Sequence, residues 1–266
     1  AVGSGGSPAG LRLQDLDLTG HEDALLARTD LEGMVVLGGR APANRWGSGA
    51  LQEFDHVPLL APVTVSAETA TGPDDIADAT HRAFQAARTA HRGPAFLDVH
   101  MDHFFDQSTS VRPGPHDDGA AGPDRAPDTD AIERIAGMLA SAERPVLVLG
   151  SDVWADFADE AALRCVEALG LPAIPNGMGR GIVPAGHPLL VTKARGMAFS
   201  RADLVVVVGT PLDFRLGYGV FGGKDGAEPA AVVHIQDSDG QLSRHANPAV
   251  ATAGDLAQVF DELTAA

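Results

Sequence analysis

Glycine and small polar residues stand directly after apolar, β-branched runs in the second half of the chain. Gly150 and Ser151 follow the run RPVLVL, and Thr210 follows LVVVVG. Glycines at strand ends allow a ligand to approach the backbone closely, and basic side chains can meet phosphate groups. In an open α/β sheet, this edge is where a dinucleotide lies. The residues that we expect there are Gly150, Ser151, Asn176, Gly177, Met178, Gly179, Lys193, Arg195, Thr210, Pro211 and Asp213.

The elements that must position these residues alternate between strand and helix. Arg144 to Gly150 and Leu204 to Gly209 are apolar runs typical of strands buried on both faces. Between them, Asp156 to Leu169 has apolar residues at helical spacing, and Leu171 to Pro175 predicts a short strand. This order is typical of right-handed βαβ units and predicts a Rossmann-like, doubly wound domain with a parallel sheet. Its further expected elements are helix 129–139, capped by Asp128 or Thr129, strand 231–235 and helix 253–263.

The first half of the chain predicts a second α/β domain. Its expected strands are 11–18, 33–39, 63–67 and 95–99, and its expected helices are 23–27 and 71–90. The long loop after residue 39 is rich in Arg, Trp, Gly, Gln and His. Loops at the carboxyl ends of parallel strands are where α/β proteins keep binding groups.

The boundaries follow from composition. Residues 1–10 are small and flexible, and 107–127 is a proline-, glycine- and aspartate-rich stretch without an apolar period. We interpret 11–106 as the first domain, 107–127 as an interdomain linker and 128–266 as the second domain.

Charge and composition exclude several classes of protein. A formal net charge of −17 is unfavourable for nucleic acid and for an anionic membrane surface. No apolar run approaches the roughly 20 residues that span a bilayer. The single cysteine, Cys165, allows no intrachain disulfide and no cysteine cluster for a metal. A cytoplasmic protein is the resulting expectation, and the charge says little about small-molecule substrates, whose site can be locally basic.

Several motifs in order resemble the acetolactate-synthase-like family of thiamine-diphosphate-dependent enzymes, and within it the actinobacterial members and the 2-hydroxyacyl-CoA lyases. These are GMVVLGGRAPANRWGSGALQEFDHVPLLAPVT, PAFLDVHMDHFFDQ, ERPVLVLGSDVW, NGMGRG and ADLVVVVGTPLDFRLGYG. The resemblance covers roughly residues 33–262. It implies that 31–106 is the later part of a pyrimidine-binding domain. It also implies that 128–266 is a central domain that binds FAD, ADP or nothing.

The same resemblance assigns roles to individual residues. His21-Glu22 resembles the family's pair whose glutamate hydrogen-bonds the cofactor's pyrimidine and promotes ylide formation. Thr19 and Glu22 also fit a helix capping box, which is the structural alternative. Gln52 resembles a residue of the active-site cleft at a subunit interface, with a plain surface loop as the alternative. His56 could be an acid or base on the substrate side, or a structural histidine at a subunit boundary. Asp237 stands beside the positions at which nucleotide-binding relatives carry acidic residues.

The resemblance leaves the Mg²⁺-diphosphate site unfilled. The family motif is Gly-Asp-Gly followed by asparagines, and neither Gly254-Asp255-Leu256 nor Lys224-Asp225-Gly226 matches it. We therefore expect no metal ligands here and no binding of the whole thiamine diphosphate by this chain alone. One reading is a truncated or split carboligase or lyase for 2-oxo acids or 2-hydroxyacyl thioesters. It would work as a homo-oligomer or with a partner chain that carries the diphosphate domain. The alternatives are a fragment of a longer chain, or a non-catalytic nucleotide-binding or interaction protein whose strand-end residues serve only the fold.

Overall fold

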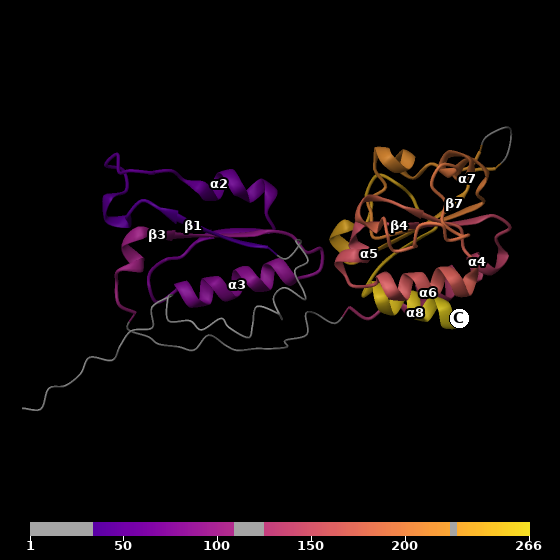
Figure 1. Cartoon of the computed structure of the whole chain (residues 1–266), viewed down its shortest axis with the longest axis horizontal. Coiled ribbons are helices and arrows are strands. Elements are labelled where there is room, and N and C mark those ends of the chain that lie inside the picture. Colours follow the sequence, from indigo (N-terminus) through magenta and orange to yellow (C-terminus); the bar gives the residue numbers. More distant parts are fainter. Residues whose placement is uncertain (1–33, 109–124, 224–227) are drawn as a thin grey trace, which may run out of the picture. The chain divides into compact units, whose positions relative to one another are not determined.

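The computed structural model describes residues 34–108, 125–223 and 228–266. The chain divides into two compact units, residues 1–119 and residues 120–266 (Figure 1). The elements expected over 11–27, and Glu22 with them, lie outside the described residues. No helix in the described ranges is long and apolar enough to cross a membrane.

Unit 1 is built on a three-stranded parallel sheet with the order β1-β3-β2. Its strands are β1 (Val35–Arg40), β2 (Ser66–Thr69) and β3 (Ala95–His100). Helix α3 (Ile76–Arg88) packs on one face through Ala79, Ala83 and Ala87, whose small side chains let the helix approach the sheet closely. The short helix α2 (His56–Leu60) lies on the other face (Figure 1).

Unit 2 is a five-stranded sheet, parallel throughout, with the order β5-β4-β6-β7-β8. Its strands are β4 (Pro145–Leu149), β5 (Ala173–Pro175), β6 (Leu204–Val208), β7 (Ala231–Gln236) and β8 (Val250–Ala253). Its α-helices are α4 (Thr129–Ser141), α5 (Ser151–Ala155), α6 (Asp159–Leu169), α7 (Arg195–Arg201) and α8 (Leu256–Ala265). Helices α4, α6 and α8 cover one face and α7 the other (Figure 1). The α/β fold with doubly wound parallel sheets is therefore confirmed.

Short 3-10 helices lie in the loops. They are η3 (Ala43–Arg45), η4 (Ala61–Val63), η5 (Met101–Phe104), η6 (Gly177–Gly179), η7 (Phe214–Gly219) and η9 (Asp239–Gln241). Most of them follow the carboxyl ends of strands, so they shape the same edge of each sheet.

Two details differ from the sequence expectation. The helix expected over 156–169 begins only at Asp159 (α6), and a separate short helix, α5, precedes it, because Phe157 between the two has a left-handed backbone (φ 57°) and Asp156 is buried. Strand β8 was not expected, since its four residues alternate small and polar side chains of which only Val250 is strongly apolar. The cap of α4 is Asp128, whose carboxylate accepts the N–H groups of Asp130 and Ala131.

The strand order contains one topological switch point. From β4 the chain crosses to β5 on one side, then returns to β6 on the other side and continues outward to β7 and β8. The crevice beyond the carboxyl ends of β4 and β6 is the place where doubly wound folds bind ligands.

Candidate functional site

The switch point of unit 2 is closed by direct backbone contact. The amide of Gly150 donates to the carbonyl of Val208 at 2.8 Å, and the carbonyl of Gly209 accepts the amide of Asp152 at 3.0 Å. A Cβ on Gly150 would overlap the carbonyl oxygen of Gly209 and the side chain of Thr210. Glycine at 150 is therefore required for the two loops to touch.

The loop after β5 forms a second layer over this contact and is hydrogen-bonded to it. The side-chain amide of Asn176 donates to the Thr210 hydroxyl at 2.9 Å, with both residues buried. The Ser151 hydroxyl accepts the amide of Met178 at 3.1 Å. Gly177 and Gly179 complete this layer, and a Cβ on Gly179 would strike the carbonyl of Leu149. The structure thus brings most of the expected residues together, and their polar groups bond to one another.

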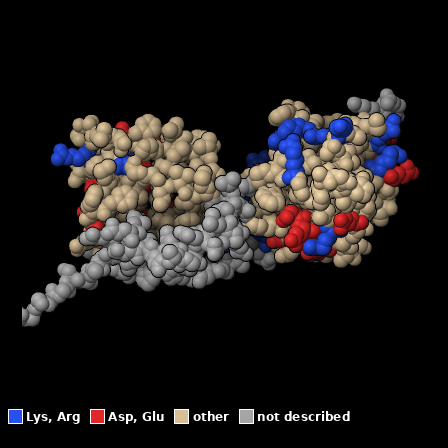
Figure 2. All heavy atoms as spheres, viewed as in Figure 1, with Lys and Arg blue, Asp and Glu red and all other residues tan. Residues whose placement is uncertain are grey.

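The remaining expected residues form a separate group around α7 and η7. Lys193 is exposed, and the guanidinium of Arg195 donates to the carbonyl of Arg215. Hydrogen bonds from Arg215 hold the pKa of Asp213 below its usual range, against the opposing effect of burial. Pro211 is exposed at the start of this loop. Figure 2 shows basic side chains gathered over the region of α7 and acidic ones over the region of α6 and α8.

A buried histidine supports the end of β7. Burial lowers the pKa of His234, and its hydrogen bond with the Thr210 carbonyl offsets this only in part. The neutral ring accepts the Ser243 amide at Nδ1 (3.3 Å), so Nε2 carries the proton and donates to Thr210 (3.2 Å). The Gln236 amide lies 2.9 Å from Nε2, and turning it places its otherwise unpartnered oxygen toward that proton.

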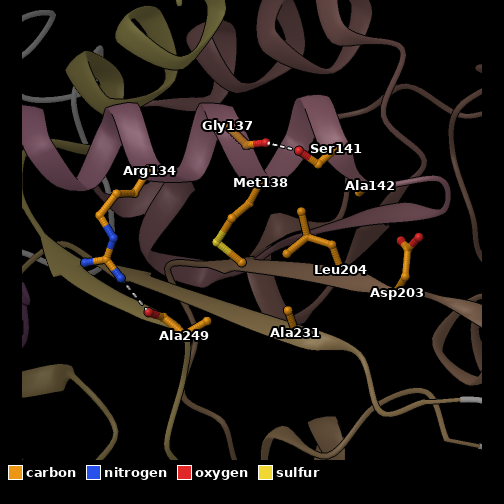
Figure 3. Close-up of a pocket in the computed structure, with 9 residues that line it drawn as sticks. All are labelled: Arg134, Gly137, Met138, Ser141, Ala142, Asp203, Leu204, Ala231 and Ala249. Carbon is orange, nitrogen blue, oxygen red and sulfur yellow. Dashed lines mark hydrogen bonds between the residues drawn. The ribbon is translucent and has the colours of Figure 1, made fainter.

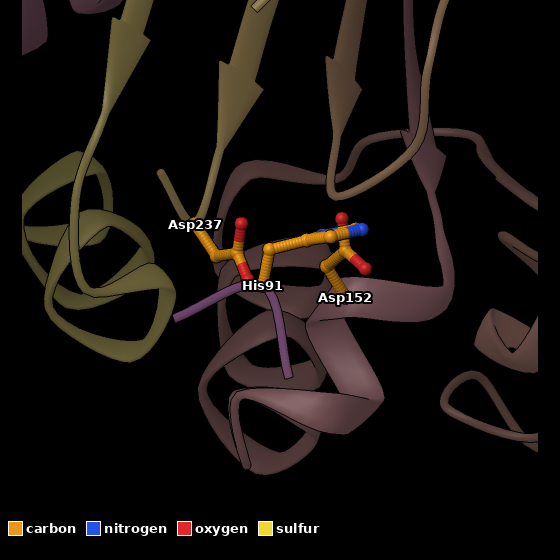
Figure 4. Close-up of side chains that lie close together, drawn as sticks. All are labelled: His91, Asp152 and Asp237. Atoms are coloured by element: carbon orange, nitrogen blue, oxygen red, sulfur yellow. The ribbon is translucent and has the colours of Figure 1, made fainter. Parts of the chain in front are cut away.

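Asp237 follows directly at the carboxyl end of β7. Figure 4 shows it and Asp152, at the start of α5, on the same edge of the sheet. Its side chain is buried and accepts the Ser238 hydroxyl at 3.1 Å, and its carbonyl accepts Arg125 at 3.2 Å. The structure places Asp237 directly after β7, and its part in a nucleotide site stays a prediction.

An arginine that sequence reasoning assigned to the linker is bonded into unit 2. The Arg125 guanidinium pairs with Asp156 (2.8 Å), whose side chain is fully buried, and with Asp255 (3.3 Å). Burial alone would lower the pKa of Arg125, but these carboxylates raise it. The sequence around Arg125 does not predict these ion pairs, because Asp156 and Asp255 lie 31 and 130 residues further along the chain.

A cavity of about 580 Å³ lies at the other end of the sheet. It opens beneath α4 beside the starts of β6 and β7 (Figure 3). Its polar groups already have partners: Arg134 donates to the Ala249 carbonyl and Ser141 to that of Gly137. Asp203 accepts the amides of Glu143 and Arg144. We assign this cavity no chemistry.

In unit 1, the loop after β1 is held by one carboxylate. Glu53 accepts the amides of Gly47 (2.9 Å), Gly49 (3.0 Å) and Ala50 (3.0 Å). These bonds, first that from Ala50, hold the pKa of Glu53 below its usual range. The neighbouring Gln52 is exposed and has a left-handed backbone, with φ 59°. A non-glycine residue held in this conformation stores strain, and such strain clusters at functional sites.

Buried charges lie beside this loop, at the carboxyl ends of β1 and β3. Asp98 is fully buried, and its Oδ2 is 3.2 Å from Nη1 of Arg40 and 3.3 Å from Nδ1 of His56. Arg40 also donates to the Thr69 hydroxyl at 2.7 Å and stacks on Trp46. Two buried atoms, Oδ1 of Asp98 and Nε of Arg40, lack a partner. Sequence reasoning noted His56 but not Arg40 or Asp98, since nothing in the spacing joins positions 40, 56 and 98.

These features define the class of domain to which unit 2 belongs. Unit 2 is a doubly wound parallel domain with its small and polar residues at the switch point, the architecture of nucleotide-binding α/β domains. Residues 132–263 match the family model described as the central domain of thiamine pyrophosphate enzymes.

Individual relatives match a larger part of the chain than the family model does. The chain is 49% identical over 191 residues to the "Acetolactate synthase large subunit IlvG" of Mycobacterium tuberculosis, covering 71% of this chain and 35% of the relative. It is 30% identical over 195 residues to a "2-hydroxyacyl-CoA lyase" of Oryza sativa subsp. japonica, covering 70% and 34%. The chain therefore belongs to the acetolactate-synthase-like thiamine diphosphate enzymes, and the resemblance is confirmed. It spans about a third of the length of these two curated relatives.

A solved structure shows the same fold. The benzoylformate decarboxylase of Polynucleobacter necessarius matches with a TM-score of 0.70 at 18% identity, covering 88% of this chain and 44% of that one.

Of the two aspartate motifs compared with the family's Mg²⁺-diphosphate motif, only Gly254-Asp255-Leu256 lies in the described residues. Asp255, the acid of Gly254-Asp255-Leu256, caps α8 by accepting the Gln258 amide and pairs with Arg125. Its carboxylate is therefore already committed to the protein, whereas Mg²⁺ needs open carboxylate, amide and carbonyl oxygens around the diphosphate.

Proposed function

We propose that this chain supplies the central domain and part of the pyrimidine-binding domain of a thiamine-diphosphate-dependent carboligase or lyase. The substrates would be 2-oxo acids or 2-hydroxyacyl thioesters. The observation that carries the proposal is the match of residues 132–263 to the central domain, together with 49% identity to a protein named as an acetolactate synthase subunit. A partner chain or a further domain would supply the Mg²⁺-diphosphate site.

The two units take different parts in this proposal. In unit 1, Gln52 on its strained loop would contribute to the reacting end of the cofactor site, and Glu22 would be the residue that hydrogen-bonds the pyrimidine. Relatives with shared active sites lead us to propose assembly with another subunit, either a second copy or a partner.

Unit 2 would hold an adenine nucleotide, FAD or ADP, along its strand ends. Lys193 and Arg195 would meet the phosphates, and Asp237 would lie near the ribose. The layer formed by Gly150, Ser151 and the 176–179 loop would be the floor of that site. The closed hydrogen bonding of this floor favours a second candidate function, in which unit 2 serves only as a structural or interaction module.

Calorimetric titration of the 266-residue chain tests these proposals. FAD, ADP and thiamine diphosphate with Mg²⁺ are each added to the purified chain. We expect binding of FAD or ADP and no saturable binding of thiamine diphosphate. Tight thiamine diphosphate binding would contradict the missing diphosphate site. Failure of all three ligands to bind would favour the non-catalytic candidate.

The catalytic half of the proposal needs a second measurement. A complete enzyme that contains this chain is assayed with pyruvate and with a 2-hydroxyacyl thioester, with and without thiamine diphosphate. We expect turnover that requires the cofactor. An enzyme that turns over neither substrate class would contradict the catalytic proposal.

A further inference from the structure

Unit 1 contains a buried aspartate that holds a partly exposed histidine. Asp98 extends from β3 on the face opposite α3, where its side chain is 0% exposed. His56 begins α2 on that face and is 27% exposed. Phe54 and Phe96 flank its ring, at centroid distances of 5.3 and 6.2 Å. One edge of the ring is therefore fixed by the protein and the other reaches the surface beside the Gln52 loop.

The geometry determines how the imidazole carries its protons. Oδ2 of a carboxylate accepts only, so Nδ1 of His56, 3.3 Å away, must be the donor. Nε2 is then left to accept or donate a proton at the exposed edge. A carboxylate that holds one ring nitrogen in this way sets the tautomer and stabilises the protonated ring, as in the aspartate–histidine pair of serine proteases.

Charged side chains from neighbouring elements surround Asp98 and His56. Arg40, from β1, contacts the same Oδ2 at 3.2 Å and is itself 8% exposed. Asp55, next to His56 in sequence, lies 3.6 Å from the other end of that guanidinium. On β2, Glu68 is occupied by an ion pair with Arg82 of α3, on the other side of the sheet. Thus one arginine and two aspartates form the charged surroundings of His56.

We propose that His56, oriented by Asp98, exchanges the proton at the carbonyl oxygen of the substrate. The inference rests on the proposed function and adds an acid–base residue to that site. When a carbon–carbon bond forms at the carbonyl carbon, the π electron pair moves onto the oxygen. The proton on Nε2 then transfers to that oxygen, leaving a neutral ring whose Nδ1–H stays on Asp98. In cleavage, neutral Nε2 takes the hydroxyl proton as the carbonyl re-forms.

The first experiment reads the tautomer and does not need turnover. Two-bond nitrogen–proton correlation spectra of the labelled 266-residue chain report which ring nitrogen of His56 carries hydrogen. We expect the Nδ1–H form at neutral pH, and a loss of this preference in Asp98→Asn. An Nε2–H form in the wild-type chain would overturn the inference.

The second experiment measures the pH profile of kcat in the complete enzyme. His56→Gln should lower kcat about 100-fold or more, with little change in KM. It should also change the pH profile of kcat, because glutamine cannot exchange a proton. His81→Gln, on α3 and outside the cluster, is the matched control and should leave both parameters unchanged. Because His56 is partly exposed, its variant is expected to fold, and circular dichroism checks this.

The outcomes separate the inference from the function beneath it. Normal kcat and an unchanged pH profile in His56→Gln, in an enzyme that turns over, would overturn the role of His56 alone. Absence of cofactor-dependent turnover in the wild type would instead overturn the proposed function, and the catalytic role with it. A loss of kcat in His56→Gln with an unchanged pH profile would also overturn proton exchange by this residue.

Discussion

The two units carry polar residues at the same edge of a parallel sheet, but the two edges are organised differently. In unit 2, Asn176 bonds Thr210, and Ser151 bonds the backbone of the next loop. In unit 1, buried atoms of Arg40 and Asp98 have no partner, and Gln52 is held in a strained backbone. Closed hydrogen bonding stabilises a fold, whereas unpaired buried groups and strain destabilise it and are typical of functional sites. Unit 2 also has an unpartnered buried atom, the Gln236 oxygen, and left-handed backbones at Phe157 and Tyr218, but in unit 1 the unpartnered atoms of Arg40 and Asp98 belong to charged groups. We therefore expect the edge of unit 1 to be the more reactive one.

The comparison predicts that substitutions at the edge of unit 2 reduce stability most. The largest effect is expected for Arg125→Ala, which leaves the fully buried Asp156 without its cation. Removing one partner of a buried pair costs about 3 kcal/mol or more. Chemical denaturation of unit 2, followed through a fluorescent group on that unit, measures it.

Arg164→Ala provides the control for this prediction. Arg164 pairs with Asp261 at 2.9 Å, close to the 2.8 Å between Arg125 and Asp156, but both side chains of this pair are more than half exposed. Surface pairs contribute less than about 1 kcal/mol. Equal effects of the two substitutions would show that the Arg125 cluster is no more than a surface contact.

The glycine contact at the switch point should give the next largest effect. In Gly150→Ala, the added Cβ would collide with the Gly209 carbonyl and Thr210, so the loops after β4 and β6 must separate. We expect destabilisation of about 3 kcal/mol, the upper range for overpacking. Gly137→Ala is the matched control, because a Cβ there meets no atom within 4 Å and lies in helix α4. It should stabilise the helix by about 1 kcal/mol.

The sequence predicts the residues at the strand ends of unit 2, but it does not predict that Arg40, His56 and Asp98 of unit 1 form a cluster. The reason is physical. Apolar runs such as Leu204–Val208 specify buried strands locally, so the residues after them are found by counting. The pairing of Arg40, His56 and Asp98 depends on which strands are neighbours, and β1 adjoins β3 although β2 lies between them in sequence. Arg125 was missed for the same reason. Glu22 and residues 11–27 stay predictions, because they lie outside the described residues.

A smaller effect of opposite sign is expected at Gln52. Gln52→Gly removes the strain of a left-handed φ of 59° and should stabilise unit 1 by about 1 kcal/mol. It also removes the amide, so cofactor-dependent kcat should fall in the complete enzyme. Gln52→Ala removes the amide but keeps the strain, so it should lower kcat equally without gaining stability. If Gln52→Gly is stabilised and fully active, the loop edge of unit 1 carries no function at this position.

The smallest effect concerns pH and tests whether unit 2 is stabilised by its own carboxylates. Burial alone would raise the pKa of Asp203, but the amides of Glu143 and Arg144 outweigh it and lower the pKa below the ordinary value of 3.8. A pKa that is lower in the folded than in the unfolded state stabilises the fold above the unfolded value. This stability is lost as pH falls below about 4. Asp203→Asn should therefore flatten the dependence of unit 2 unfolding on pH in that range and leave its slope above pH 5 unchanged. A steeper acid limb in the variant would mean that Asp203 opposes folding, and that the starts of β4 and β6 are held together by other contacts.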